Sequence, residues 1–311
     1  MSSNLVSSTI PCVIFGFNRP DFLEQVLDSL KRQNISKLII FIDGPRDKSD
    51  INLVEQSCEV AHRVDWTETE FVFKQENGGL LGIADNITRI LSEYQAAVFV
   101  EDDCLPMPAF YSFMCAALRQ FEHNKQVFSI GGYQIVEPEF FKDYSYSVVS
   151  GARFMCWGWA TWKDRWELVR SYSQTYTTLF DNLNNVPGYA GCDIPTTARA
   201  CALGAEQTWD TPVAITTLWL KQVHLIAVRG LIKNLGNSGT GTHDGTNYAH
   251  FHGRNVWQAP LENLMWPDDA SLNKAYLDEV MKLLDTIFKN TPPSLLSRIA
   301  GKIKSVFTLK N

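Results

Sequence analysis

The sequence of 311 residues lacks an apolar run of transmembrane length, a low-complexity tract and any internal repeat. Without such a run it holds no candidate membrane-spanning helix. The apolar run 10–17, which follows nine mostly polar residues, is too short and wrongly flanked for a signal peptide. We therefore expect a cytoplasmic protein with one large globular core.

Cysteine pairs and positive charge are also lacking. The seven cysteines are odd in number and show no C-x-x-C spacing, so reduced thiols are the simplest interpretation. The net charge is −6, which argues against sequence-independent binding of nucleic acid, and we expect no nucleic-acid partner. An anionic ligand would need a metal ion and local arginines.

Short apolar runs alternate with helical patterns through the first 106 residues. Strands are expected at 10–17, 37–42, 70–73 and 96–101, and helices at 49–64 and 80–94. A further helix is expected to begin at Pro20, with apolar residues at helical spacing up to Leu30. Each strand ends in polar residues or glycine. This alternation predicts an α/β fold with a mostly parallel central sheet flanked by helices, and a ligand site at the carboxyl ends of the strands.

The strand at 96–101 ends in three carboxylates, Glu101, Asp102 and Asp103, before Pro106 stops regular continuation. Strand alternation would place Glu101 and Asp103 on one side and Asp102 on the other. Hard oxygen ligands at this edge suit Mg²⁺ or Mn²⁺ holding a diphosphate. The alternative is a solvated turn or a structural salt-bridge cluster.

Aromatic and glycine-rich segments mark the second half. Four tryptophans lie between 157 and 166, Trp209-Asp210 opens an expected helix that ends near 221, and four glycines fall between 234 and 245. Further elements are expected at 109–123 (helix), 127–132 and 224–228 (strands), and in the last fifty residues (helices).

The order of these motifs resembles that of GT-A-fold, nucleotide-sugar-dependent glycosyltransferases. The likeness is greatest to the N-acetylglucosaminyltransferase I-like group and to related bacterial polysaccharide transferases, and it spans roughly 10–247. The motifs are listed here in chain order: Asn18-Arg19-Pro20, the Asp43 loop, Glu101-Asp102-Asp103, Trp157-Gly158-Trp159, Trp209-Asp210 and Gly241-Thr242-His243. The resemblance implies a single Rossmann-like domain at 1–254, with a nucleotide-binding half (1–106), an acceptor half (107–254) and a helical tail (255–311).

The resemblance also implies roles for the residues of the nucleotide half. Arg19 would contact the diphosphate, and Asp43 the base or ribose. Asp103 would ligate the divalent metal, and Glu101 and Asp102 would face the donor sugar and ribose. The alternatives are a surface arginine before a helix for Arg19 and a turn-forming aspartate for Asp43.

Two motifs of the acceptor half carry predictions. One of Trp157 and Trp159 is expected at the sugar site and the other in the core, with Gly158 letting backbone approach a bound sugar. Asp210 occupies the position of the family's general base, although Thr211 stands where a second acid is common. A helix N-cap without chemistry is the alternative for Asp210.

Two later segments allow more than one interpretation. His243 could complete the metal shell or touch the diphosphate. The segment 292–311 carries apolar residues at helical spacing among basic residues and has no acid. It is typical of an interfacial helix at the inner face of the membrane, which would suit a lipid-linked glycan acceptor, or of a helix that covers the core.

The resemblance implies metal-dependent, inverting transfer of a sugar from a nucleotide sugar, expected to be UDP-linked, to a glycan or lipid-linked glycan hydroxyl. Two other functions remain open from the sequence. One is a sugar-1-phosphate nucleotidyltransferase, although the segment after the first strand lacks the Gly-rich, basic loop of those enzymes. The other is a non-catalytic protein of the same fold that binds glycans or nucleotides.

Overall fold

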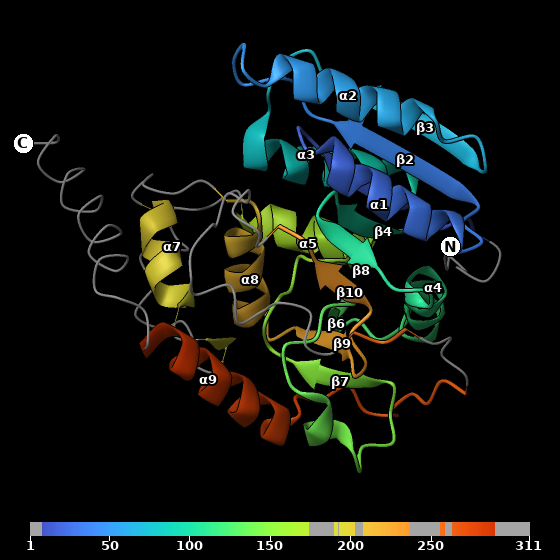
Figure 1. The fold of residues 1–311 in the computed structure, drawn as a ribbon. Helices are drawn as coiled ribbons and strands as arrows, with labels where there is room; N and C mark the ends of the chain where they lie inside the picture. Colours follow the sequence, from blue (N-terminus) through green and yellow to red (C-terminus); the bar gives the residue numbers. More distant parts are fainter. Residues whose placement is uncertain are drawn as a thin grey trace, which may run out of the picture.

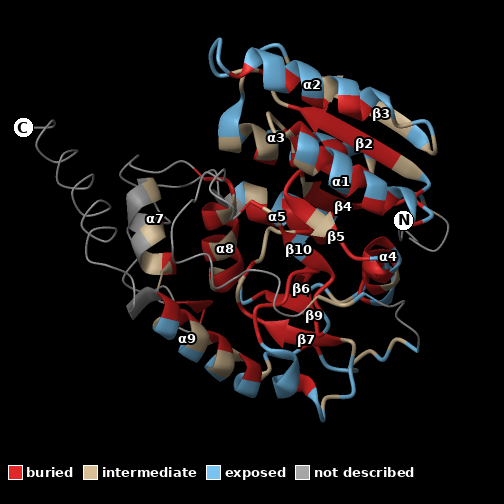
Figure 2. Cartoon of the chain, viewed as in Figure 1, coloured by how far each residue is buried: buried red, intermediate tan, exposed pale blue. Residues whose placement is uncertain are grey.

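The structure is a computed structural model. It describes residues 8–173, 190–191, 193–202, 208–236, 256–258 and 263–289. Eight strands form the central sheet, and they are β1 (Cys12–Gly16), β2 (Lys37–Ile42), β3 (Glu68–Phe73), β4 (Ala96–Glu101), β6 (Val127–Gly131), β7 (Val148–Gly151), β8 (Trp159–Trp162) and β9 (Val223–Ala227). Most of these strands are buried, as Figure 2 shows.

Helices cover both faces of this sheet (Figure 1). They are α1 (Pro20–Lys31), α2 (Ile51–His62), α3 (Gly79–Glu93), α4 (Phe110–Gln120), α5 (Lys163–Ser173), α7 (Ile194–Ala202), α8 (Asp210–Trp219) and α9 (Lys274–Lys289), with a short 3-10 helix η1 (Pro138–Phe141). Successive side chains of a strand point to opposite faces. Ile14 of β1 therefore joins the core beneath α1, α2 and α4, whereas Val13 joins the core beneath α3, α5 and α8.

The strand order is β3-β2-β1-β4-β8-β6-β9-β7. Strands β1 to β4 are parallel to one another, and β6 is parallel to β9. The structure thus confirms the predicted α/β class with a mostly parallel sheet. The single sheet runs across the predicted boundary between residues 106 and 107.

Strand β8 lies antiparallel between β4 and β6, in a segment that the sequence analysis treated as an aromatic block. Trp159 packs on one face of the sheet and Trp162 on the other. The Trp162 indole N–H donates to the Leu118 carbonyl at 3.1 Å, and the Thr161 hydroxyl donates to the Phe128 carbonyl at 2.6 Å. The Thr161 hydroxyl and the Trp162 indole of this buried strand therefore both have a partner.

A second, two-stranded sheet pairs β5 (Cys104–Pro106) with β10 (Ile232–Asn234) in antiparallel fashion. The Leu235 N–H donates to the Asp103 carbonyl at 2.7 Å. This small sheet brings the end of β10 beside the acidic turn that follows β4.

Helix α9 falls within the predicted tail 255–311, yet it packs on the core through Tyr276, Val280 and Leu284. The Tyr276 hydroxyl donates to Gln134 Oε1 at 3.1 Å. Within the described ranges, no helix combines the length and apolar character that crossing a membrane requires. The basic, apolar segment 292–311 lies outside the described residues, so its role stays a prediction.

Position 158 requires glycine because the backbone there packs closely against β10. Its φ is +65°, and a Cβ there would lie 2.3 Å from Ile232 Cγ1 and 3.2 Å from Phe110 Cε2. Gly158→Ala is therefore expected to lower the free energy of unfolding by roughly 2–4 kcal/mol, from overpacking and left-handed backbone strain together. Urea unfolding measures the change, and Gly82→Ala inside α3 is the control, because an alanine there meets only the flexible end of Lys74. Equal stability of Gly158→Ala and wild type would contradict this packing.

His224 of β9 is a buried histidine that predicts a pH dependence of stability. Its Nδ1 lies 2.8 Å from Ser129 Oγ and its Nε2 lies 3.2 Å from Thr217 Oγ1. Burial lowers the pKa of His224 to about 3. In the unfolded chain, the histidine takes up a proton near pH 6.5. The stability that neutral His224 contributes to the folded state is therefore fully present above that pH, and it is lost as the pH drops from about 6.5 towards 3.

At pH 5 the free energy of unfolding is expected to be lower by roughly 2 kcal/mol than at pH 7 because of His224 alone. Chemical unfolding of wild type and His224→Gln at both pH values measures it, because the variant lacks this component. His123→Gln, at an exposed position, is the control and should follow wild type. An equal drop in stability for wild type and His224→Gln would contradict the prediction.

Candidate active site

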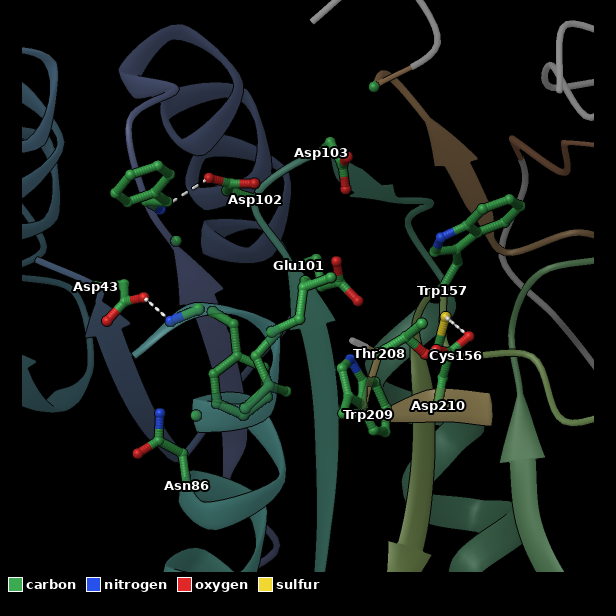
Figure 3. Close-up of a pocket in the computed structure, with 18 of the residues that line it drawn as sticks. Asp43, Asn86, Glu101, Asp102, Asp103, Cys156, Trp157, Thr208, Trp209 and Asp210 are labelled. Atoms are coloured by element: carbon green, nitrogen blue, oxygen red, sulfur yellow. Dashed lines mark hydrogen bonds between the residues drawn. The ribbon is translucent and has the colours of Figure 1, made fainter. Parts of the chain in front are cut away.

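A cavity of about 620 Å³ opens where the sheet meets α3 and α8 (Figure 3). Its walls include the segments that follow β1, β2 and β4, the start of α3, residues 153–157 and the start of α8. The carboxyl ends of parallel strands are the usual ligand site of open α/β sheets. The volume suits a ligand of nucleotide-sugar size.

The acidic turn lies in this cavity. Strand β4 ends at Glu101, and Asp102 and Asp103 form a turn before β5. The predicted alternation of the three side chains therefore does not continue past Glu101, because only a strand alternates. Asp102 Oδ2 accepts the Phe17 N–H at 3.0 Å.

Arg19 joins the two aspartates. Its guanidinium donates to Asp103 Oδ2 at 2.7 Å and to Asp102 Oδ1. Arg19 precedes Pro20, which begins α1, so its backbone is held at the start of that helix. The side chain is half-buried and faces the cavity with the acids. This arrangement excludes the purely surface role that the sequence left open for Arg19.

Two of the acidic groups, Glu101 and Asp102, have a raised pKa. Burial raises the pKa of Glu101 well above its usual value, and the neighbouring Asp103, Asp102 and Asp210 raise it further, while Arg19 lowers it. Burial also raises the pKa of Asp102, against the opposing effect of Arg19. A cation placed among these oxygens would relieve the repulsion.

The acidic set offers carboxylate oxygens of the kind that can hold a divalent metal together with a substrate phosphate. Among the described residues, no group of three or more His, Cys, Asp or Glu side chains is placed to hold a metal ion. Mg²⁺ is commonly bound through one or two carboxylates plus substrate phosphates. The Asp103 Oδ1, whose nearest partner is Cys104 Sγ at 3.5 Å, is the carboxylate oxygen that fits such a role.

Asp43 follows β2 and ties two loops together. Its carboxylate accepts the Gly78 N–H at 3.0 Å and the Gly79 N–H at 3.0 Å, at the start of α3. Asp43 also lines the cavity, together with Arg46 and Lys74. The structure therefore gives Asp43 a structural role in shaping this end of the cavity, beside the nucleotide contact that stays a prediction.

Asp210 begins α8 and lies across the cavity from the acidic turn (Figure 3). Its Oδ1 accepts the Thr208 hydroxyl, and its Oδ2 lies 4.0 Å from Cys156 Sγ. The Thr211 N–H donates to Thr208 Oγ1 at 3.3 Å. The side chain that caps the amino end of α8 is thus Thr208, and not Asp210 as one alternative had it.

The Trp157-Gly158-Trp159 motif divides between cavity and core. Trp157 lines the cavity and makes an edge contact with Tyr133, with 4.8 Å between ring centroids. Trp159 is 1% exposed and stacks on Trp209 in the core, so it does not reach the cavity. Gly158 packs on Ile232 and is not part of the cavity wall. A sugar-contact role therefore remains only for Trp157.

The cavity has a further wall at the start of α7. The Arg153 guanidinium forks onto the Asp193 carboxylate at 2.9 and 2.7 Å and also donates to the Ala190 carbonyl at 3.1 Å. Arg153 and Asp193 both line the cavity. This pair holds Ala190 and Asp193 at the edge of the site.

No family model matches the sequence, and no curated protein matches it. Three solved structures illustrate what the fold is similar to. The first is the mannosyltransferase PcManGT from Pyrobaculum calidifontis in complex with GDP-Man and Mn²⁺, with 14% sequence identity, a TM-score of 0.38, and coverage of 73% of this chain and 59% of that chain. The second is GalNAc-T7 with UDP, GalNAc and Mn²⁺, with 7% identity, a TM-score of 0.45, and coverage of 72% of this chain and 43% of that chain. The third is a cytidylyltransferase from Leptospira borgpetersenii, with 11% identity, a TM-score of 0.35, and coverage of 52% of this chain and 64% of that chain. The chain thus covers less than two thirds of the length of each. These similarities are too distant to assign residues, so the roles proposed below follow from the chain's own geometry.

Some of the predicted site residues lie outside the residues that the structure describes, and the sequence did not predict some of the contacts in the site. His243 and the glycine-rich segment beyond Gly236 are outside the described residues. Thr208 and Cys156, which contact Asp210, were not predicted. The preference for threonine just before a helix is a signal that could have identified Thr208. No sequence signal pointed to Cys156, which meets Asp210 only through the fold.

Proposed function

We propose that the chain is a GT-A-type glycosyltransferase that moves a sugar from a nucleotide sugar to a hydroxyl group. The observation that supports this most is the placement of two separate acidic elements on one cavity. Asp103 and its neighbours lie beside Arg19 at the end of β4, and Asp210 lies at the start of α8. Such a site offers one wall for a diphosphate and another for an acceptor.

On the donor side, Arg19 would contact diphosphate oxygens, which a guanidinium can bind in pairs. Asp103 would hold Mn²⁺ or Mg²⁺. The ion, when bound, would supply positive charge to the leaving diphosphate. Because the carboxylates outnumber Arg19 in this part of the cavity, a diphosphate would be repelled without added positive charge. The donor in this proposal is UDP-linked, with Asp43 near the base or ribose.

On the acceptor side, Asp210 would act as the general base. The acceptor hydroxyl oxygen forms a bond to the anomeric carbon, and its proton goes to the Asp210 carboxylate. The bond between the sugar and the diphosphate breaks, and its electron pair leaves with the nucleoside diphosphate. A direct displacement of this kind inverts the anomeric configuration, so an α-linked donor would yield a β-linked product.

The acceptor is proposed to be a glycan or lipid-linked glycan hydroxyl, with Trp157 offering an indole face to a sugar ring. Contact with the inner face of a membrane depends on segment 292–311, which the structure does not describe. It therefore remains part of the proposal alone.

The test is a panel of nucleotide sugars with Mn²⁺ or Mg²⁺, with and without glycan acceptors, read by release of nucleoside diphosphate. The proposal expects metal-dependent release from one donor, and faster release with acceptor. Release of pyrophosphate from a nucleoside triphosphate and a sugar 1-phosphate would instead support a nucleotidyltransferase. Tight nucleotide binding without turnover of any donor would support a non-catalytic binding protein.

A further inference from the structure

The contacts of Asp210 leave its two carboxylate oxygens unequal. Oδ1 accepts the Thr208 hydroxyl, whereas Oδ2 has, within the part of the chain that the structure describes, only the thiol of Cys156 at 4.0 Å. Burial raises the pKa of Cys156 well above its usual value, and Asp210 raises it further, so the thiol stays neutral and is a weak donor. Oδ2 is therefore the oxygen left for a substrate hydroxyl.

Thr208 has the hydrogen-bond capacity for this task. A hydroxyl has one proton and two lone pairs. The charged carboxylate of Asp210 is the strongest acceptor near Thr208 Oγ1, so the proton goes there. The lone pairs then serve the Thr211 N–H at 3.3 Å and the Thr211 hydroxyl, whose oxygen is 3.2 Å away.

Burial makes this arrangement rigid. Thr208 and Thr211 are 7% and 8% exposed, and Trp209 between them is packed on Phe154 and Trp159. The Thr208 backbone therefore cannot shift without disturbing the core beneath α8. Because the Thr208 hydroxyl is held in place at the start of α8, it can keep the Asp210 carboxylate in one rotamer, whereas an exposed carboxylate would sample several.

We propose that Thr208 is a positioning residue, whose hydroxyl holds the Asp210 carboxylate with Oδ2 directed at the acceptor. The inference rests on the proposed function, because it assigns a cause to the orientation of the proposed base. The hydroxyl caps α8 and orients Asp210 at the same time, so the helix end and the base share one anchor.

The first test compares Thr208→Val, which has nearly the same shape but no hydroxyl, with Thr208→Ser, which keeps it. Thr208→Val is expected to lower kcat by roughly ten- to a hundredfold with the KM for donor nearly unchanged. Thr208→Ser should restore kcat to near the wild-type value. A Thr208→Val enzyme with wild-type kcat, or a Thr208→Ser enzyme as slow as Thr208→Val, would overturn the proposal.

Thr217→Val, inside α8, is the matched control for loss of a buried threonine hydroxyl that bonds to this helix. The Thr217 hydroxyl donates to the Val213 carbonyl and contacts His224, away from the cavity wall. It should lower stability while leaving kcat unchanged. An equal fall in kcat for Thr217→Val and Thr208→Val would show general damage to α8 and overturn the positioning role.

A double-mutant cycle separates action through Asp210 from an independent effect. If Thr208 acts only by orienting the base, Thr208→Val should cost nothing further in kcat once Asp210→Asn is present. Additive losses would overturn the proposal.

Crystal structures of wild type and Thr208→Val give a readout that needs no turnover. The proposal expects the Asp210 side chain in one rotamer in wild type and in a different or mixed set in Thr208→Val. An unchanged rotamer would overturn it. A wild type that transfers no sugar but shows the rotamer change would overturn the proposed function while supporting the anchor, so the two failures are distinguishable.

Discussion

Asp210→Asn is expected to lower turnover by roughly a hundredfold or more, and to leave donor affinity nearly unchanged. Asparagine keeps the size of the side chain but cannot take the proton of the acceptor hydroxyl at neutral pH. In the proposed function the donor binds around Arg19 and Asp103 and not at Asp210, so donor affinity should not respond. Initial rates with saturating donor, and calorimetric affinity for UDP with Mn²⁺, measure the two quantities.

The fold should tolerate this change, because Thr208 supplies the cap of α8. Asp164→Asn, at the start of α5 and outside the cavity wall, is the control for an aspartate changed in the first turn of a helix. It should retain wild-type turnover. Near-normal turnover of Asp210→Asn would end the assignment of the base, and Glu101 would be the next carboxylate of the cavity to test.

Asp103→Asn is expected to weaken metal-dependent binding of UDP by roughly ten- to a hundredfold. The amide removes the negative charge that would hold the cation beside the diphosphate. Arg19 keeps its pairing with Asp102, and Asp102 keeps the Phe17 N–H, so the turn itself should stay folded. Calorimetry of UDP with Mn²⁺ measures the effect, and a thermal unfolding curve checks the fold.

Chelation gives the control for this variant. With EDTA present, wild type and Asp103→Asn should bind UDP with similar, weak affinity, since both then lack the cation. Equal affinity of the two proteins for UDP in the presence of Mn²⁺, with the variant folded, would place the metal site elsewhere.

The sequence predicts the first half of the fold well for a physical reason. Strands such as β1 and β2 are short apolar runs, and helices such as α1 and α3 carry apolar residues at a spacing that matches one buried face. Strand β8 escaped prediction because its four residues bury both faces, so no alternation distinguishes them from a core aromatic cluster.

The candidate site, too, could be predicted from the sequence only in part. The resemblance in motif order suggested that Arg19, Asp103 and Asp210 meet, and all three line one cavity. Local rules could not show that the β4 alternation stops at Glu101, or that Arg19 bridges both aspartates, because these depend on pairing between distant segments. The sequence did predict that Trp157 and Trp159 would divide between cavity and core, but it could not tell which of them faces the cavity, which the structure shows to be Trp157.

The position of β8 also bears on how the chain assembles during synthesis. Strands β1 to β4 are complete by residue 101, but the outer edge of β4 has no partner until residues 159–162 arrive and pair with it. That edge consists of Ala96–Glu101, which are buried almost throughout in the finished protein. A nascent or truncated chain that ends before Trp159 therefore presents an open apolar edge, the kind of surface on which strands of other chains add.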